Sequence, residues 1–152
     1  RAYRYVLYQS PVRPALWHGK VGWTHHDLDE QAIRGAMACL EGEHDFSTFR
    51  SSECQAKSPV KQLHAVRLHR RDSYWLFDFY ASGFLHHMVR NLVGALLVVG
   101  RNAYSPEWMQ KLLLSRDRTK APPTFAPDGL YLTKVIYPLQ WGLPDPPSLP
   151  FD

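Results

Sequence analysis

The segment 84–99 constrains the fold most, because its apolar side chains recur at helical spacing. Apolar residues stand four apart, with others beside them, at Phe84, Leu85, Met88, Val89, Leu92, Val93, Leu96 and Val99. This pattern predicts a long helix with one broad apolar face, ending at Gly100 as its C′ residue. A helix with such a face must be covered by another layer, so an isolated helix or a fibrous fold is excluded.

The segments around this helix predict the layer that covers it. Val60–Leu68 and Tyr74–Tyr80 are rich in β-branched and aromatic residues and flank a short polar turn, which predicts a hairpin. Further elements are predicted as strands at 3–8 and 131–137, a helix from an Asp27 N-cap to Gly42, and a helix at 105–115 that begins with Ser105 and Pro106.

This order of elements predicts an α+β fold, an antiparallel sheet backed by helices on one face. A chain of 152 residues suits one domain, which we expect to span residues 1–137. Residues 138–152 are rich in proline and predict an extended tail. The chain opens within a strand pattern, so we expect either that its start was processed or cut or that it is a piece of a longer protein.

Composition narrows the class of protein. Hydrophobic residues make up 45% of the chain, which excludes a disordered segment, and no apolar run approaches the roughly 20 residues that cross a bilayer. Two cysteines, Cys39 and Cys54, are too few for a disulfide scaffold or a four-thiolate zinc site. We therefore expect a cytoplasmic protein with no membrane association.

The charge balance favours a nucleic-acid partner. Lys and Arg number 18 against 14 Asp and Glu, which gives a net charge of +4. One group of cations follows a loop and the predicted hairpin, at Arg50, Lys57, Lys61, Arg67, Arg70 and Arg71. We expect Arg50 and Lys57 to contact RNA phosphates, because neutralising phosphates is the main source of affinity for nucleic acids.

One polar stripe on the predicted long helix suggests a binding site. His87, Arg90, Asn91 and Gly94 fall at helical spacing on the face opposite the apolar one. A single arginine beside an imidazole and an amide can pair with a carboxylate or a phosphate. The alternatives are an ordinary surface or an ion pair that serves only the structure.

Other candidate chemistry is weaker. The pairs His25-His26 and His86-His87 lack the spacing that puts two imidazoles on one metal ion, so a metal-dependent nuclease is only a remote alternative. Asp78 alternates with aromatic residues in a strand and is a candidate inward-facing carboxylate.

Four motifs in order resemble the TruA family of tRNA pseudouridine synthases. They lie at 45–55 (D-F-S-T-F-R, then C-Q), 86–94 (H-H-M-V-R-N-L-V-G), 129–132 (G-L-Y-L) and 1–5 (R-A-Y-R-Y). The resemblance implies two similar α+β halves, a homodimer, and conversion of uridine to pseudouridine near the 3′ side of the tRNA anticodon stem-loop. It implies neither a metal nor a cofactor.

The resemblance also implies roles for single residues. Tyr3 matches the tyrosine that stacks on the target uracil and assists proton removal. Arg90 matches the arginine that pairs with the catalytic aspartate, and Leu130 matches the apolar residue that packs against the target base. We assign substrate binding to Asn91 and His87 as well.

The catalytic aspartate of that family lies in an N-terminal G-R-T-D motif that this sequence does not contain. We therefore expect this chain to be the C-terminal half of such an enzyme, inactive without its N-terminal half. The alternative is a stand-alone RNA-binding or assembly module that has lost the chemistry. A G-R-T-D motif upstream of Arg1 in the coding frame favours the first, and a start codon just ahead favours the second.

Overall fold

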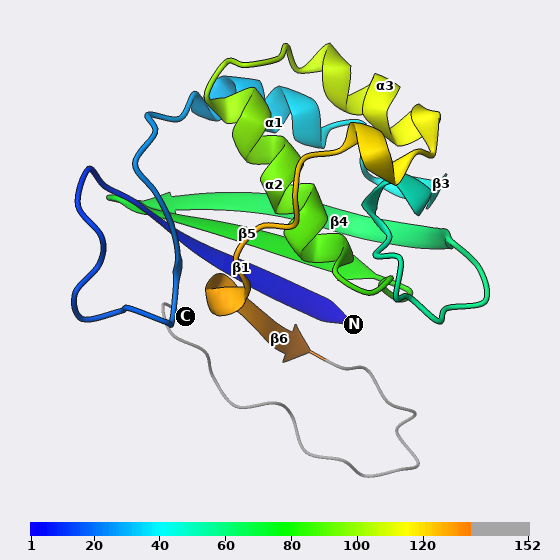
Figure 1. The fold of residues 1–152 in the computed structure, drawn as a ribbon, viewed down its shortest axis with the longest axis horizontal. Helices are drawn as coiled ribbons and strands as arrows, with labels where there is room; N and C mark the ends of the chain where they lie inside the picture. The colour runs from blue at the N-terminus through cyan, green and yellow to red at the C-terminus, as the bar shows by residue number, and fades with distance from the viewer. Residues whose placement is uncertain (135–152) are drawn as a thin grey trace, which may run out of the picture.

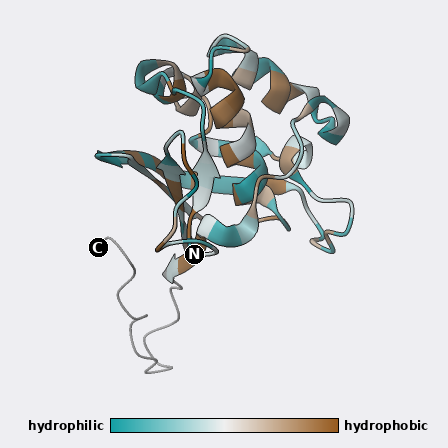
Figure 2. Ribbon diagram, turned by 60° about the vertical axis from the view of Figure 1, so that its left-hand side comes forward, coloured by the Kyte–Doolittle hydropathy of each residue, from teal (hydrophilic) through white to brown (hydrophobic). Residues whose placement is uncertain are grey.

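The computed structural model describes residues 1–134 as a six-stranded sheet with three α-helices (Figure 1). The strands are β1 Ala2–Gln9, β2 Gly22–Thr24, β3 Gly42–Asp45, β4 Val60–Arg71, β5 Tyr74–Ala81 and β6 Leu130–Lys134. The helices are α1 Glu30–Met37, α2 Met88–Gly100 and α3 Glu107–Ser115. The helices gather on one side of the sheet in both views, which confirms the predicted α+β architecture (Figures 1 and 2).

The sheet runs in the order β2-β1-β5-β4-β3, and β6 pairs with β1 as well. β2 and β6 pair with different halves of the same edge of β1. β2 pairs with the second half of β1, where Leu7 is opposite Gly22. β6 pairs with the first half of β1, where Tyr5 is opposite Leu130. Every pairing is antiparallel except the short parallel pair β1–β2. The sheet is therefore mixed, which corrects the prediction in this one respect.

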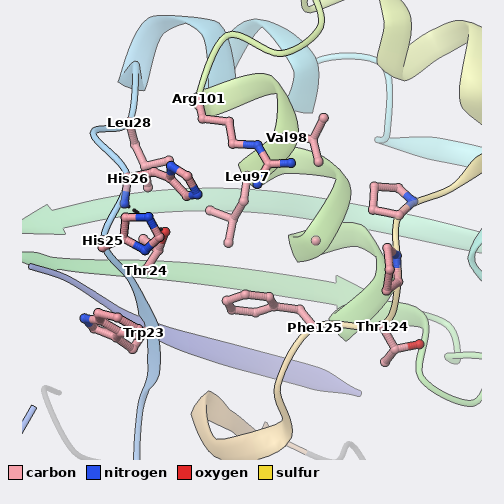
Figure 3. Close-up of a pocket in the computed structure, with 13 residues that line it drawn as sticks. Trp23, Thr24, His25, His26, Leu28, Leu97, Val98, Arg101, Thr124 and Phe125 are labelled. Carbon is pink, nitrogen blue, oxygen red and sulfur yellow. Dashed lines mark hydrogen bonds between the residues drawn. The ribbon is translucent and has the colours of Figure 1, made fainter. Parts of the chain in front are cut away.

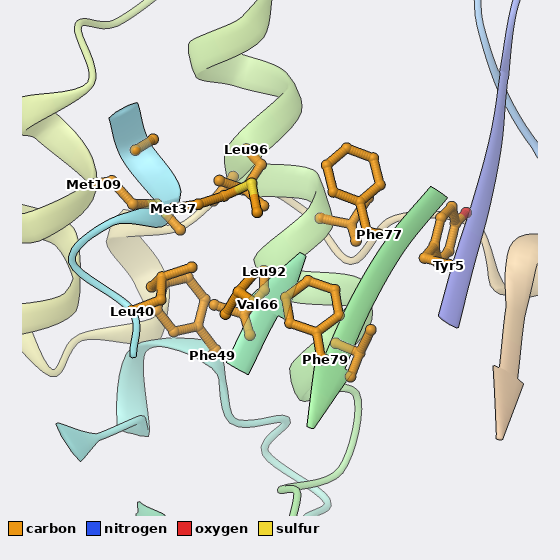
Figure 4. Close-up of a cluster of buried hydrophobic side chains, with 14 of the residues drawn as sticks. Tyr5, Met37, Leu40, Phe49, Val66, Phe77, Phe79, Leu92, Leu96 and Met109 are labelled. Carbon is orange, nitrogen blue, oxygen red and sulfur yellow. The ribbon is translucent and has the colours of Figure 1, made fainter. Parts of the chain in front are cut away.

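Alternation along β1 and β5 gives the sheet two different faces. Tyr5 and Leu7 belong to the core beneath the helices, whereas Val6 and Leu76 form a smaller cluster on the other face. The main core joins side chains from strands and helices, including Met37, Leu40, Phe49, Val66, Phe77, Phe79, Leu92, Leu96 and Met109 (Figure 4). Burying each such side chain contributes roughly 1.5–3 kcal/mol, so this cluster is what holds the two layers together.

Helix α1 begins later than predicted. Its N-cap is Asp29, whose carboxylate accepts a hydrogen bond of 3.0 Å from the backbone N–H of Ala32. Glu30, expected to complete a capping box with Asp27, instead pairs with Arg34 one turn away at 3.0 Å. The prediction was wrong by two residues because both aspartates have the chemistry of a cap and only tertiary packing selects one.

Helix α2 also begins later than predicted, at Met88. His87 has a left-handed backbone with φ of 62°, which interrupts any helix that starts at Phe84. Gly100 is the last residue of the helix rather than its C′ residue. An added Cβ there would lie 2.6 Å from Cδ1 of Ile33, so glycine allows α1 and α2 to approach closely.

The hairpin β4–β5 is confirmed, whereas the sequence pattern missed β2 and β3. Both are short, and they lie at opposite ends of the strand order. β6 begins at Leu130, and the predicted strand 131–137 is confirmed as far as Lys134. The rest of that strand, the boundary at residue 137 and the Pro-rich tail lie outside the described residues. No helix within residues 1–134 is long and apolar enough to cross a membrane.

Candidate active site

A cavity of about 340 Å³ lies where the N-terminal end of α2 meets the start of β1 and β6. In Figure 1 these three parts of the chain converge near the N-terminus. The lining residues are Arg1, Tyr3, Phe84, Leu85, His86, His87, Met88, Val89, Arg90, Pro127 and Leu130. The cavity thus brings together four of the seven residues that the sequence predicted for the site: Tyr3, His87, Arg90 and Leu130.

Tyr3 and Leu130 provide the flat and apolar walls of this cavity. The rings of Tyr3 and Phe84 pack edge to face, with their centroids 4.9 Å apart and their planes at 90° to each other. Leu130 opens β6 beside β1, opposite Tyr5. The sequence missed Phe84 as a site residue, because its position in an apolar pattern assigns it to the core.

Arg90 is the one residue of α2, all of which is described, that is not buried. Its Nε donates a hydrogen bond of 2.7 Å to the carbonyl oxygen of Phe125. Within residues 1–134 its two terminal nitrogens have no hydrogen-bond or ion-pair partner. No Asp or Glu is among the described residues that line the cavity. Among the residues that the structure describes, Arg90 is therefore a cation with two unpartnered nitrogens in a cavity that no carboxylate lines.

His87 contributes an imidazole held against a second one. Its ring stacks on that of His86 with centroids 3.8 Å apart. Burial, together with the neighbouring His86 and Arg90, lowers the pKa of His87 below its ordinary value. His87 is therefore uncharged at neutral pH and offers a hydrogen bond rather than a charge to a ligand.

Asn91, Arg50 and Lys57 lie outside the cavity. Asn91 is fully buried, and its amide nitrogen donates to the carbonyl oxygen of Phe49 at 2.8 Å. It does not lie on an open polar face with Arg90, which corrects the predicted stripe. Arg50 donates to the carbonyl oxygens of Cys54 and Ala56, at 3.2 and 2.8 Å, and so shapes a loop.

Lys57 is exposed on this same loop. The loop contacts the cavity wall where the backbone N–H of His86 donates to Sγ of Cys54 at 3.3 Å. Arg50 and Lys57 therefore belong to a loop that touches the cavity wall, and neither of them lines the cavity.

Two other sequence candidates are accounted for by the structure. Asp78 is not inward-facing, since it pairs with Arg4 at 2.8 Å on the face of the sheet away from the helices. On the hairpin, Arg67 and Arg70 face Glu41 and Glu30 at 3.1 and 3.7 Å, so part of the predicted basic group is neutralised within the domain.

A second cavity, of about 350 Å³, lies at the other end of α2 and contains none of the predicted site residues (Figure 3). His25 and His26 stand on its wall with ring centroids 4.1 Å apart. In the described part of the chain, no three His, Cys, Asp or Glu side chains are placed to hold a metal ion.

Comparison with known proteins decides the family. The family model described as tRNA pseudouridine synthase matches residues 36–138. The chain belongs to the tRNA pseudouridine synthase family. The resemblance inferred from the four motifs is thereby confirmed, and the matched region includes α2 with Arg90 as well as β6 with Leu130.

Members of the tRNA pseudouridine synthase family from several bacteria are similar to nearly the whole chain. The tRNA pseudouridine synthase A of Aromatoleum aromaticum is 58% identical over 95% of this chain and 54% of that protein. The tRNA pseudouridine synthase A of Chromobacterium violaceum is 60% identical over 95% of this chain and 55% of that protein. The tRNA pseudouridine synthase A of Dechloromonas aromatica is 51% identical over 96% of this chain and 56% of that protein. The chain therefore spans about half the length of these relatives.

Proposed function

We propose that this chain is the C-terminal half of an enzyme that converts uridine to pseudouridine in tRNA. The observation that carries the proposal is the position of Arg90, which lines a cavity together with Tyr3 and Leu130 and whose terminal guanidinium nitrogens have no partner among residues 1–134. The N-terminal half supplies the missing anion, a catalytic aspartate that pairs with Arg90. Relatives of about twice the length of the chain support this division.

The pairing with Arg90 suits the chemistry of the reaction. An adjacent guanidinium favours the ionised form of an aspartate, which is the form that attacks. The C1′–N1 bond of the uridine breaks, the uracil turns, and a C1′–C5 bond forms. The C5 hydrogen leaves as a proton and N1 gains one, so the product is an isomer of the substrate and needs no cofactor.

Tyr3 and Leu130 hold the uracil during its rotation. A phenol ring and an isobutyl group on two adjacent strands form a flat slot, and the contact with Phe84 fixes the plane of Tyr3. The phenol oxygen then relays the C5 proton, accepting it as its own hydroxyl proton passes to solvent. The target nucleotide must leave its stack to reach this slot, as in other enzymes that modify bases.

The resemblance narrows the substrate and the assembly further. We propose that the target uridines lie near the 3′ side of the anticodon stem-loop, and that the complete enzyme is a cytoplasmic homodimer. Arg50 and Lys57, whose loop touches the cavity wall, are proposed to contact phosphates of the tRNA. Asn91 is proposed to support Arg90 from within the core rather than touch the substrate, since it is fully buried.

A Tyr3→Phe variant tests the role of the phenol oxygen. In the chain combined with its N-terminal half, we expect kcat for tritium release from tRNA labelled at uracil C5 to fall about a hundredfold, because proton transfer by a positioned side chain contributes about that much. KM for tRNA is expected to stay within about twofold, because the ring still stacks. A variant as fast as the wild type would exclude the phenol from proton removal.

A further inference from the structure

Arg118 makes an unusual set of contacts beside the candidate active site. Its guanidinium donates to four oxygen atoms, which are the carbonyl oxygens of Ala121 (3.4 Å) and Pro122 (3.0 Å), Oγ1 of Thr124 (3.2 Å) and Oδ1 of Asn91 (3.2 Å). All four acceptors are uncharged, and Arg118 has no ion-pair partner within residues 1–134.

These contacts fix residues 121–125, which we call the strap, across the surface of α2. The strap crosses the helix at Gly94, where an added Cβ would lie 3.3 Å from the carbonyl oxygen of Pro123. Arg118 binds the strap on one side and, through Asn91, the helix on the other. Asn91 is in turn anchored to the carbonyl oxygen of Phe49. One guanidinium thus holds two separate segments in a fixed relation.

The strap ends at the atom that orients Arg90. The carbonyl oxygen of Phe125 accepts the Nε hydrogen bond of Arg90, whose side chain lines the cavity and whose terminal nitrogens have no acceptor among the described residues. If the strap shifted, that carbonyl would shift with it, and the guanidinium of Arg90 would turn. Arg118 is therefore linked to Arg90 through the strap.

We propose that Arg118 is a positioning residue, which holds the strap so that Phe125 aims Arg90 at the catalytic aspartate. The proposal rests on the proposed function, because the aspartate belongs to the N-terminal half. Only a planar fork of donors reaches acceptors on two segments at once, so lysine, with its compact ammonium, is a poor substitute. The positive charge of Arg118 is not what the position requires, since no anion faces it among the described residues.

The first test observes Arg90 directly and does not need activity. The Nε–H signal of Arg90 is followed by NMR in the 152-residue chain and assigned by its loss in Arg90→Lys. In Arg118→Lys, we expect the signal to move toward that of a free arginine and its exchange with water to accelerate about tenfold. Thr124→Val removes one acceptor of Arg118 with little change of shape, so it should give a smaller shift in the same direction.

A matched control separates positioning from loss of stability. Arg34→Lys makes the same substitution at another arginine, where it removes the 2.9 Å hydrogen bond from Nη2 of Arg34 to the carbonyl oxygen of Leu68, and neither residue takes part in the hydrogen bonds of Arg118, the strap or Arg90. The Arg90 signal should be unchanged in this variant. An unchanged signal in both Arg118→Lys and Thr124→Val would overturn the proposal, even if those proteins were less stable.

The second test measures catalysis by the chain combined with its N-terminal half. Arg118→Lys should lower kcat for tritium release about tenfold and leave KM for tRNA within about twofold, because misplacing a catalytic group lowers the rate without weakening binding. Arg34→Lys should keep the wild-type kcat per folded molecule. A displaced Arg90 signal with an unchanged kcat would also contradict the proposal. If the wild-type enzyme releases no tritium, the proposed function fails, and the Arg90 signal still decides whether Arg118 positions Arg90.

Discussion

Replacing Arg90 with glutamine is expected to abolish pseudouridine formation by the complete enzyme, lowering the rate of tritium release by at least about a thousandfold. Glutamine keeps a side chain that can form hydrogen bonds but removes the charge that favours an ionised aspartate. The helix should tolerate the change, because Arg90 is the one residue of α2 that is not buried. Rates are compared with those of the wild type at saturating tRNA labelled at uracil C5.

A matched control lies at the other end of the same helix. Arg101 is an exposed arginine that caps α2 and does not line the candidate active site, so Arg101→Gln should keep the wild-type rate. The rate of the Arg90→Lys enzyme should lie between those of Arg90→Gln and Arg101→Gln, since lysine keeps the charge but lacks the planar guanidinium donors. An Arg90→Gln enzyme within tenfold of the wild-type rate would contradict the assigned role of Arg90.

Replacing Gly129 with alanine is expected to lower the free energy of unfolding by about 3 kcal/mol or more, because overpacking against rigid neighbours is destabilising. An added Cβ would overlap the carbonyl oxygen of Val6 and lie 2.7 Å from the backbone nitrogen of Gly22. Both atoms belong to the backbone of paired strands, so neither can rotate away. The expected result is a much lower midpoint of urea unfolding at an unchanged slope.

Gly83→Ala is the control for this substitution. The nearest atoms to its added Cβ are those of the flexible end of Lys61, the closest at 3.6 Å. Its free energy of unfolding should stay within about 0.5 kcal/mol of the wild type. Equal stability of the Gly129→Ala and Gly83→Ala proteins would show that β1, β2 and the turn before β6 are less closely packed than described.

The sequence predicted the elements whose pattern is long and local. In the hairpin β4–β5 and in α2, many consecutive residues follow one hydrophobic periodicity, and this indicates a single type of secondary structure. β2 and β3 were missed because strands of three and four residues are too short to show a hydrophobic periodicity. The choice between Asp27 and Asp29 as a cap depends on packing that no local pattern records.

Helical spacing identified Arg90 as a site residue but did not predict which segments of the chain surround it. Helical spacing places Arg90, Asn91 and Gly94 near one another, but it does not predict that the strap covers Gly94 or that Arg118 binds Asn91. The strap lies about 30 residues further along the chain, and its contact with Arg90 is made by a backbone carbonyl, which any residue type provides. The roles of Phe125 and Arg118 therefore emerged only from the fold.

The most direct test of the central claim measures tritium release from tRNA labelled at uracil C5 by the 152-residue chain alone, by the N-terminal half alone, and by both together. Circular dichroism first establishes that each protein is folded. We expect no release by either half and release by the mixture, because Arg90 and the aspartate come from different halves. Release by this chain alone would contradict the account, since one of its own carboxylates would then have to carry out the reaction.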